Sequence, residues 1–136
     1  MSPPAALELA AEVAEALVHH ARAELPNEAC GLLSGTAGRA TTFHPARNAL
    51  GSPRRYDLHP EDLVRFMFEI EAAGDELVAI FHSHTRAPAV PSATDVRSAE
   101  YRVPYLIATL EAGPGPMLRA WWIESGGVAE IPVRVA

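Results

Sequence analysis

The chain has 136 residues, of which 49% are hydrophobic, and carries a formal net charge of −6 at pH 7. A chain of this length is expected to form one domain spanning residues 1–136 and to bury around two thirds of its unfolded surface. Its acidic balance, without a basic run, argues against nucleic acid as a main partner. Because it has neither a bilayer-length apolar stretch nor the basic start of a signal peptide, we expect a cytoplasmic protein without a membrane partner.

The N-terminal third predicts one helix followed by two strands. Apolar residues at helical spacing indicate an amphipathic helix from Ala5 to Glu24, which ends before Pro26. Those apolar residues are Leu9, Val13, Leu17 and Val18. Two candidate strands follow at Glu28–Ser34 and Ala40–His44, joined by a turn at residues 35–38.

The middle third predicts a helix, a buried strand, a loop and a short helix. The longer of these two helices, which is the second helix of the chain, begins at Pro60 and ends at Gly74. Proline suits a first helical position, and glycine ends the helical pattern. The short apolar run Leu77–Phe81 predicts a buried strand, and the proline-rich segment 85–91 predicts a loop. A short helix is expected from about Ala93 to Tyr101.

The C-terminal third predicts three strands separated by turns. The strands are expected at Tyr105–Leu110, Met117–Ile123 and Val128–Val135, and the turns at residues 113–116 and 125–127. Pro132 indicates a sheet edge, because proline cannot donate to a ladder. Trp121 and Trp122 point to opposite faces of their strand, so one is expected in the core while the other is free to contact a partner. Together the elements predict an α/β fold: a mixed central β-sheet flanked by helices in a three-layer-like arrangement.

The strongest functional signal lies between the predicted strand and the short helix. His82-Ser83-His84 is followed, after seven residues, by Ser92, and after two more by Asp95. Alternate side chains share one face of a strand, so the two histidines are expected to point the same way while Ser83 points to the other side. Two imidazoles and a carboxylate leave a fourth tetrahedral position open for water, which is typical of a catalytic zinc site.

The segment Ser92-Ala93-Thr94-Asp95 resembles a helix start, with Ser92 as N-cap and an acidic residue three positions later. The exposed amides and the helix dipole favour an ionised Asp95, as a hard oxygen ligand must be. Such a segment alone is usually only a cap. Attached to two histidines at this distance, it predicts a metal site at His82, His84 and Asp95.

The pattern H-S-H-x7-S-x2-D, with a glutamate upstream, resembles the JAMM (MPN+) zinc metalloproteases of the compact prokaryotic type. The segment Pro26–Gly35 is similar to the family's upstream glutamate followed by a glycine-containing apolar strand. Asn48, Tyr56 and His59-Pro60 resemble a stretch between the second strand and second helix of such proteins. Thr85 departs from the family, since many relatives have proline there; it is not a ligand in the family, so the change concerns loop rigidity.

The resemblance implies a role for each site residue. His82, His84 and Asp95 would hold one zinc ion with a bound catalytic water. Glu28 would act as the general base, taking a proton from this water and delivering it to the leaving amine. Ser92 would hydrogen-bond the tetrahedral oxyanion.

The resemblance covers about residues 6–123 and implies the MPN fold, which is cytidine-deaminase-like, together with a substrate class. It implies a metallopeptidase or isopeptidase that hydrolyses an amide or isopeptide bond at the C-terminus of a ubiquitin-like or sulfur-carrier protein. An extended Gly-Gly tail would reach the metal by pairing with a sheet edge. The sequence leaves open whether the chain forms a homodimer.

Two other functions share part of this signal. A non-catalytic MPN scaffold or interaction domain would have the same fold, but such modules usually lack one or more site residues. A zinc deaminase needs a Cys-x-x-Cys pair, which the single cysteine, Cys30, excludes. The pair Arg54-Arg55 is either solvated or a contact for an acidic substrate surface. The histidines without ligand-like spacing are interpreted as surface or capping residues, namely His19, His20, His44 and His59.

Overall fold

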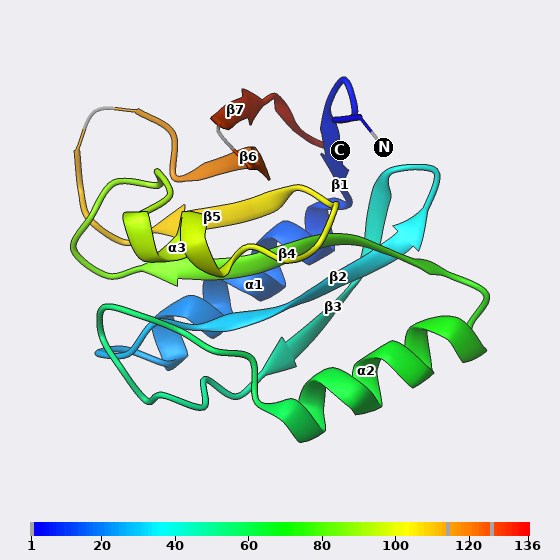
Figure 1. Ribbon diagram of the computed structural model, residues 1–136, viewed down its shortest axis with the longest axis horizontal. Helices are drawn as coiled ribbons and strands as arrows, with labels where there is room; N and C mark the ends of the chain where they lie inside the picture. Colours follow the sequence, from blue (N-terminus) through cyan, green and yellow to red (C-terminus); the bar gives the residue numbers. More distant parts are fainter. Residues whose placement is uncertain (1, 114, 126) are drawn as a thin grey trace.

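The computed structural model describes residues 2–113, 115–125 and 127–136. Its elements, in chain order, are β1 (Leu7–Leu9), α1 (Ala11–Ala23), β2 (Cys30–Thr36), β3 (Arg39–Ala46), α2 (Pro60–Ala72), β4 (Glu76–His84), α3 (Ala93–Ser98), β5 (Tyr105–Thr109), β6 (Leu118–Glu124), β7 (Gly127–Ile131) and β8 (Val133–Val135) (Figure 1). The predicted turns at 113–116 and 125–127 contain Pro114 and Gly126, which lie outside the described residues. No helix in the described part of the chain is both long enough and apolar enough to cross a bilayer.

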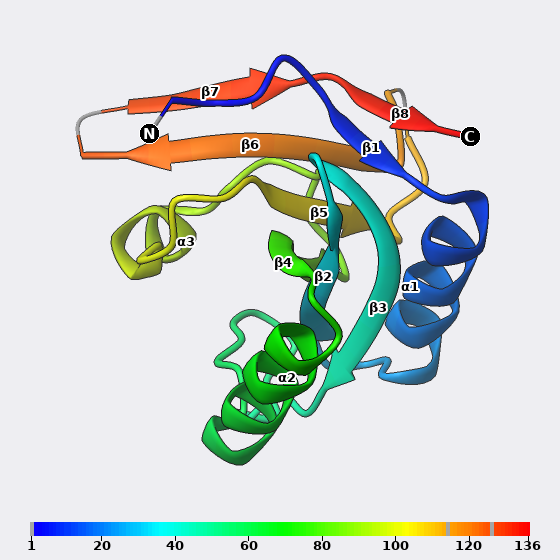
Figure 2. The same ribbon diagram turned by 90° about the vertical axis from the view of Figure 1, so that its right-hand side faces the viewer.

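The strands form one mixed sheet in the order β7-β6-β5-β4-β2-β3-β1-β8. β4 pairs in parallel with β5, and β1 pairs in parallel with β3 and β8, while the other neighbours are antiparallel. β7 and β8 lie at opposite ends of this order although only Pro132 separates them in the chain, so the sheet curls until its ends meet (Figure 2). Pro132 has no N–H to donate, and its carbonyl accepts a hydrogen bond from the Leu7 amide at 2.8 Å. One continuous strand over residues 128–135 was therefore a wrong prediction, although both pieces are edge strands.

The predicted first helix is wrong at its N-terminal end. Leu7 and Leu9 are buried and Glu8 between them is exposed, a period-two pattern, and these residues form β1 between β3 and β8. α1 begins only at Ala11. Pairing on both sides outweighs the helical pattern, because it buries both leucines and satisfies the backbone groups of the segment.

The short helix α3 ends at Ser98 rather than at Tyr101. Ala99 has an extended backbone, and the amides of Glu100 and Tyr101 both donate to the Tyr105 hydroxyl at 3.1 Å. Because these amides find a side-chain acceptor, they do not continue the helical ladder.

The helices cover both faces of the sheet and give three layers, with α1 on one face and α2 and α3 on the other (Figure 2). Adjacent residues of the central strands supply both interfaces. Leu33 and Phe81 pack toward α1, whereas Leu32 and Ile80 pack toward α2. This confirms the predicted α/β fold with a mixed sheet flanked by helices. Because side chains alternate along a strand, the even-numbered residues at the end of β4 lie on the same face as Ile80, which is the α2 face.

Both tryptophans of β6 are buried, with 9% of Trp121 and 4% of Trp122 exposed. They do lie on opposite faces, Trp121 in the cluster under α2 and Trp122 in the cluster under α1. Each indole N–H is bonded, that of Trp121 to the Ala89 carbonyl at 2.9 Å and that of Trp122 to Glu124 at 2.8 Å. The expectation that one tryptophan is free for a partner is therefore wrong, because both faces of the sheet are covered.

Candidate metal centre and active site

The two histidines lie at the end of a strand in the middle of the sheet. β4 runs between β2 and β5, and His82 and His84 are almost fully buried, with 1% and 4% exposed. Their ring nitrogens converge on the same side of the strand, as the alternation predicted. Ser83 instead accepts a hydrogen bond from the Ala29 amide at 2.8 Å, which ties β4 to the residue that follows Glu28.

The loop over residues 85–91 brings α3 to the end of β4. The Ala87 carbonyl accepts a hydrogen bond from the Thr109 hydroxyl at 2.7 Å, and the Ala89 carbonyl accepts one from the Trp121 indole at 2.9 Å. These bonds fix the loop against β5 and β6. They thereby set where α3 begins.

The helix α3 begins with the predicted capping box. The Ser92 hydroxyl oxygen accepts a hydrogen bond from the Asp95 amide at 3.1 Å, and Asp95 Oδ2 accepts one from the Ser92 amide at 2.8 Å. The same Oδ2 atom faces both histidines. The helix cap therefore also orients the carboxylate of the site.

Three donor atoms form a nearly equilateral triangle. His82 Nε2, His84 Nε2 and Asp95 Oδ2 are each 3.2 Å from the other two. Ligands of a tetrahedral zinc ion at about 2.0 Å stand roughly 3.3 Å apart. The three atoms thus have the spacing of three corners of a zinc tetrahedron, with the fourth corner free.

The hydrogen bond of His84 to Pro88 decides which ring nitrogen of His84 faces the triangle. Its Nδ1 is 2.7 Å from the Pro88 carbonyl oxygen, which can only accept, so Nδ1 carries the proton. In the neutral imidazole, Nε2 then presents a lone pair to the Asp95 carboxylate at 3.2 Å. A proton would bridge two of these atoms, whereas a metal ion joins all three. The donor set fits one zinc ion.

The charges in the triangle shift one another's pKa. Burial opposes ionisation of Asp95, but the hydrogen bonds from His82 and His84 hold the pKa of this carboxyl well below its usual range. Burial lowers the pKa of His84, yet Asp95 and the Pro88 carbonyl raise it overall. Burial lowers the pKa of His82. A divalent cation bound between the buried imidazoles would stabilise the ionised form of Asp95.

Glu28 lies in a wider group around the same centre. One of its carboxylate oxygens and one ring nitrogen from each of His82 and His84 lie within 4.8 Å of one another, against 3.2 Å in the triangle with Asp95. Glu28 is 4% exposed, and its Oε1 has no hydrogen-bond partner among the described residues. This spacing favours Asp95 as the third ligand and leaves Glu28 to contact a molecule at the fourth corner.

The environment of Glu28 suits proton transfer near neutral pH. Burial raises its pKa to about 7, against a lowering effect of His84 and a further raising effect of Asp95. Its backbone is fixed on both sides: the Glu28 amide donates to the Ser52 carbonyl at 2.8 Å, and the Asn48 side chain donates to the Glu28 carbonyl at 3.0 Å. The structure thus brings all five predicted site residues together, and the roles assigned to them stay predictions.

Two supporting residues gained a physical role only from the structure. The Tyr56 ring stacks on the His82 ring, with centroids 4.4 Å apart and an interplanar angle of 20°. Asn48 organises the loop after β3, since its Oδ1 accepts hydrogen bonds from the Leu50 and Asp57 amides at 3.1 Å. An asparagine between a strand and a helix is a recognisable loop signal, but its partners are not local.

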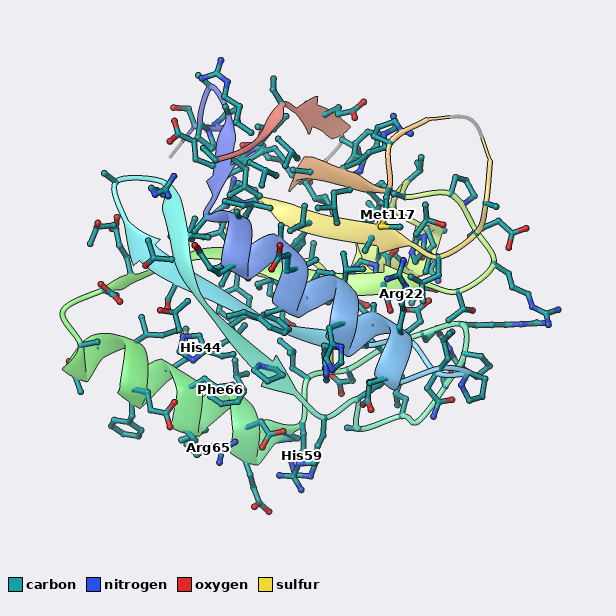
Figure 3. All side chains as sticks on the ribbon, turned by 180° about the vertical axis from the view of Figure 1, so that it is seen from behind. Arg22, His44, His59, Arg65, Phe66 and Met117 are labelled. Carbon is teal, nitrogen blue, oxygen red and sulfur yellow. The ribbon has the colours of Figure 1, made fainter. Side chains whose placement is uncertain are left out.

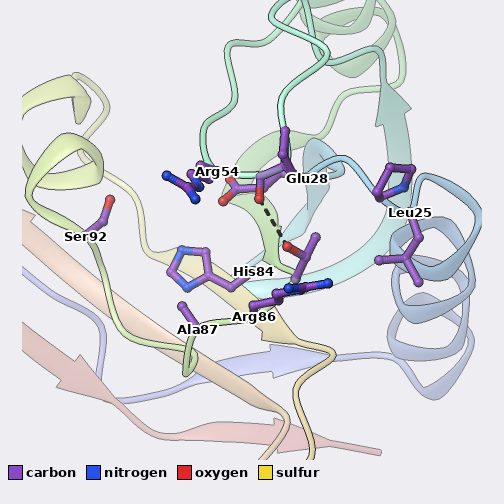
Figure 4. A pocket seen from close by; sticks show the side chains of 10 residues that line it. Leu25, Glu28, Arg54, His84, Arg86, Ala87 and Ser92 are labelled. Atoms are coloured by element: carbon purple, nitrogen blue, oxygen red, sulfur yellow. Dashed lines mark hydrogen bonds between the residues drawn. The ribbon is translucent and has the colours of Figure 1, made fainter.

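A cleft of about 820 Å³ opens onto these groups. Figure 4 shows Glu28 and Arg54 above His84, with Arg86 to the right of His84 and across the gap from Arg54. Ser92 borders the cleft from α3, and Leu25 lines it near the end of α1. The candidate site is therefore accessible from the cleft although its two histidines are buried.

Thr85, where many relatives have proline, forms a bond near the cleft. Its hydroxyl donates to the Pro53 carbonyl at 3.1 Å, which joins the loop after β4 to the loop before α2 (Figure 4, dashed line). Proline could not make this bond because it has no side-chain donor. The threonine thus restrains the loop by a hydrogen bond where proline would restrain it by its ring.

Residues 10–124 match the family described as prokaryotic homologs of the JAB domain. The chain belongs to this JAB family. It is 40% identical over 102 residues to a protein of Haloferax volcanii named desampylase, covering 70% of this chain and 73% of that protein. It is 37% identical over 132 residues to the CysO-cysteine peptidase of Mycobacterium tuberculosis, covering 95% and 90% of the two proteins.

Solved structures agree with membership of the JAB family. A protein from Desulfitobacterium hafniense matches with a TM-score of 0.87 at 31% identity, covering 96% of this chain and 92% of that one. A JAB1/MPN domain protein from Archaeoglobus fulgidus matches with a TM-score of 0.63 at 12% identity, covering 98% and 100%, which shows a shared fold. The JAMM/MPN resemblance drawn from the motif is confirmed.

Proposed function

We propose that the chain is a zinc metallopeptidase that hydrolyses an amide or isopeptide bond at the C-terminus of a ubiquitin-like or sulfur-carrier protein. The observation that carries the proposal is the 3.2 Å triangle of His82, His84 and Asp95 with the buried Glu28 carboxylate beside it. The names of two relatives, desampylase and CysO-cysteine peptidase, support this reaction and substrate class.

The residues around the triangle have complementary tasks in this proposal. A zinc ion there would acidify a water molecule and polarise the scissile carbonyl. Glu28 accepts the released proton and delivers it to the leaving amine, for which a pKa near the working pH is suited. Ser92 accepts the Asp95 amide at its hydroxyl oxygen, so its hydroxyl hydrogen is free for the oxyanion. Tyr56 and the Pro88 carbonyl keep the two imidazoles oriented.

The proposal includes an extended Gly-Gly tail of the substrate in the cleft. Glycine lacks a Cβ and lets a backbone pass closely between walls. β4 is paired on both sides by β2 and β5, so the tail cannot add to the strand that carries the histidines. We propose that backbone pairing near the metal uses the loop over residues 85–91, which lines the cleft. We further propose that residues 1–136 act as one domain in the cytoplasm and that two copies of the chain can form a homodimer.

The function is tested with the purified, zinc-loaded chain. The substrates are a ubiquitin-like sulfur-carrier protein bearing one cysteine after its C-terminal residue, and the same carrier joined to a lysine side chain. We expect about one zinc per chain by elemental analysis and release of intact carrier from at least one substrate by mass spectrometry. A chelator should stop the release and added zinc should restore it. Bound zinc without cleavage of either substrate would contradict the peptidase and favour a non-catalytic scaffold.

Replacing Ser92 with Ala is expected to lower turnover about a hundredfold or more, because an oxyanion donor is lost. Zinc content should stay at the wild-type level, since Asp95 Oδ2 still accepts the backbone amide of residue 92. Steady-state cleavage and elemental analysis check both points. The control is Ser98→Ala at the exposed end of the same helix, which should behave like the wild type. If Ser92→Ala has wild-type turnover, Ser92 does not bind the oxyanion and only caps α3.

A further inference from the structure

The cleft contains a cation that the mechanism above does not use. Arg54 is exposed on the cleft wall, and among the described residues its guanidinium forms no ion pair. The protein as a whole carries a net charge of −6, so acidic partners are abundant elsewhere on its surface. An arginine without such a partner, in the same cleft as the proposed catalytic carboxylate, is available for an anionic ligand.

The loop segment that carries Arg54 is tied to the active site. The Ser52 carbonyl accepts the Glu28 amide at 2.8 Å, and the Ser52 hydroxyl accepts the Arg54 amide at 3.1 Å. The Pro53 carbonyl accepts the Thr85 hydroxyl at 3.1 Å. The backbone of Arg54 is therefore held from both the Glu28 side and the β4 side of the cleft.

The flanks of this loop are held as well. The Asn48 side-chain amide donates to the carbonyls of both Arg55 and Glu28 at 3.0 Å. At the start of the loop, Arg47 donates three hydrogen bonds of 2.8 to 3.0 Å to the buried Asp62 carboxylate at the beginning of α2. Only the Arg54 side chain remains to be ordered when a ligand binds, which keeps the entropic cost of binding low.

The position of Arg54 relative to Glu28 indicates which part of a substrate it meets. Figure 4 shows Arg54 and Glu28 together above His84, whereas Arg86 lies lower in the view, across the gap from both. In the proposed reaction the C–N bond breaks, the hydroxyl of water goes to the carrier carbonyl carbon, and Glu28 gives a proton to the leaving nitrogen. The leaving group therefore lies on the side of Glu28 and Arg54. When that leaving group is an amino acid, its carboxylate is only two bonds from the nitrogen.

We propose that Arg54 binds the free α-carboxylate of a single amino acid that leaves from the carrier's C-terminus. The inference rests on the proposed function and names its preferred substrate: a carrier–amino acid adduct rather than a carrier joined to a protein lysine. A guanidinium matches a carboxylate with two parallel N–H donors. A lysine side-chain nitrogen leads to methylene groups and offers no carboxylate at this place. Arg54 takes part in neither bond change and acts as a specificity-determining residue.

The test compares two carriers that differ in one charge. Both are the ubiquitin-like sulfur carrier bearing one C-terminal cysteine, the first as the free acid and the second as the carboxamide. We expect the zinc-loaded wild type to favour the acid at least about tenfold in kcat/KM, which corresponds to about 1.4 kcal/mol. In Arg54→Ala the ratio should fall to about one, because kcat/KM falls for the free acid and not for the carboxamide. In Arg54→Glu the kcat/KM of the free acid should be lower than that of the carboxamide.

Two other arginines serve as matched controls. Arg55 is the neighbour of Arg54 but does not line the cleft, and Arg86 lines its opposite side. Arg55→Ala and Arg86→Ala should keep the wild-type preference for the acid, and all variants should keep their zinc. A wild-type ratio near one, or an undiminished ratio in Arg54→Ala, would overturn the inference and leave the peptidase standing. If the wild type cleaves neither these carriers nor the lysine-linked carrier, the proposed function fails and this inference fails with it.

Discussion

Glu28→Gln is expected to retain about one zinc ion per chain while its turnover of the carrier adduct falls by about a hundredfold to ten-thousandfold. Glutamine has the size of glutamate, but its amide cannot take up and return a proton. The backbone bonds to Ser52 and Asn48, which fix residue 28, do not involve the side chain and should persist. Elemental analysis and single-turnover cleavage, measured on the same preparation, check the two halves of this expectation.

The control for this variant is Glu61→Gln, an exposed glutamate in the first turn of α2. It removes the same charge without touching the cleft and should retain full turnover. If Glu28→Gln loses as much zinc as a variant of a histidine ligand, then Glu28 is itself a ligand and the assignment of the base is wrong.

His82→Ala is expected to lose both zinc and turnover, because it removes one corner of the 3.2 Å triangle. Two remaining ligands hold the ion far more weakly than three. The substitution also leaves the Tyr56 ring without its stacking partner and opens a cavity under it, so the folded state should lose stability as well. Zinc content after dialysis, far-UV circular dichroism and cleavage of the carrier adduct separate metal loss from unfolding.

His59→Ala provides the matched histidine control. His59 caps α2 by accepting the Glu61 amide at 3.3 Å and lies outside the triangle, so this variant should keep its zinc and its turnover. Full zinc occupancy in a folded His82→Ala protein would contradict the metal centre. It would contradict the proposed peptidase as well, because the zinc ion would then not depend on the triangle that faces Glu28.

The residues of the candidate metal centre could be predicted from the sequence because their signals are short-range. Alternation along a strand makes His82 and His84 share a face whatever surrounds them. The capping box that orients Asp95 is formed within four residues. Neither signal depends on contacts with distant parts of the chain, and both agree with the structure.

Local sequence patterns mislead where distant contacts compete with them. Leu9 fits the periodicity of a helix, yet it belongs to β1, because β8 from the far end of the chain offers a partner. Trp121 and Trp122 occupy opposite faces as predicted, but their burial depends on helices that the local pattern does not position. In each case the buried area and backbone bonds of the assembled sheet outweigh the local preference.

Local spacing in this chain thus predicts the chemical type of the candidate centre: nitrogen, nitrogen and oxygen ligands with a free fourth corner. The distances among its parts depend on folding. Glu28 approaches the histidines because β2 pairs with β4, and the Ala29–Ser83 bond that accompanies this pairing spans 54 positions. Arg54 lines the same cleft, where its neighbours Ser52 and Pro53 accept hydrogen bonds from the Glu28 amide and the Thr85 hydroxyl. Such long-range contacts leave no periodic trace in the residues that make them, because each is selected by the packed surroundings rather than by its neighbours in the chain.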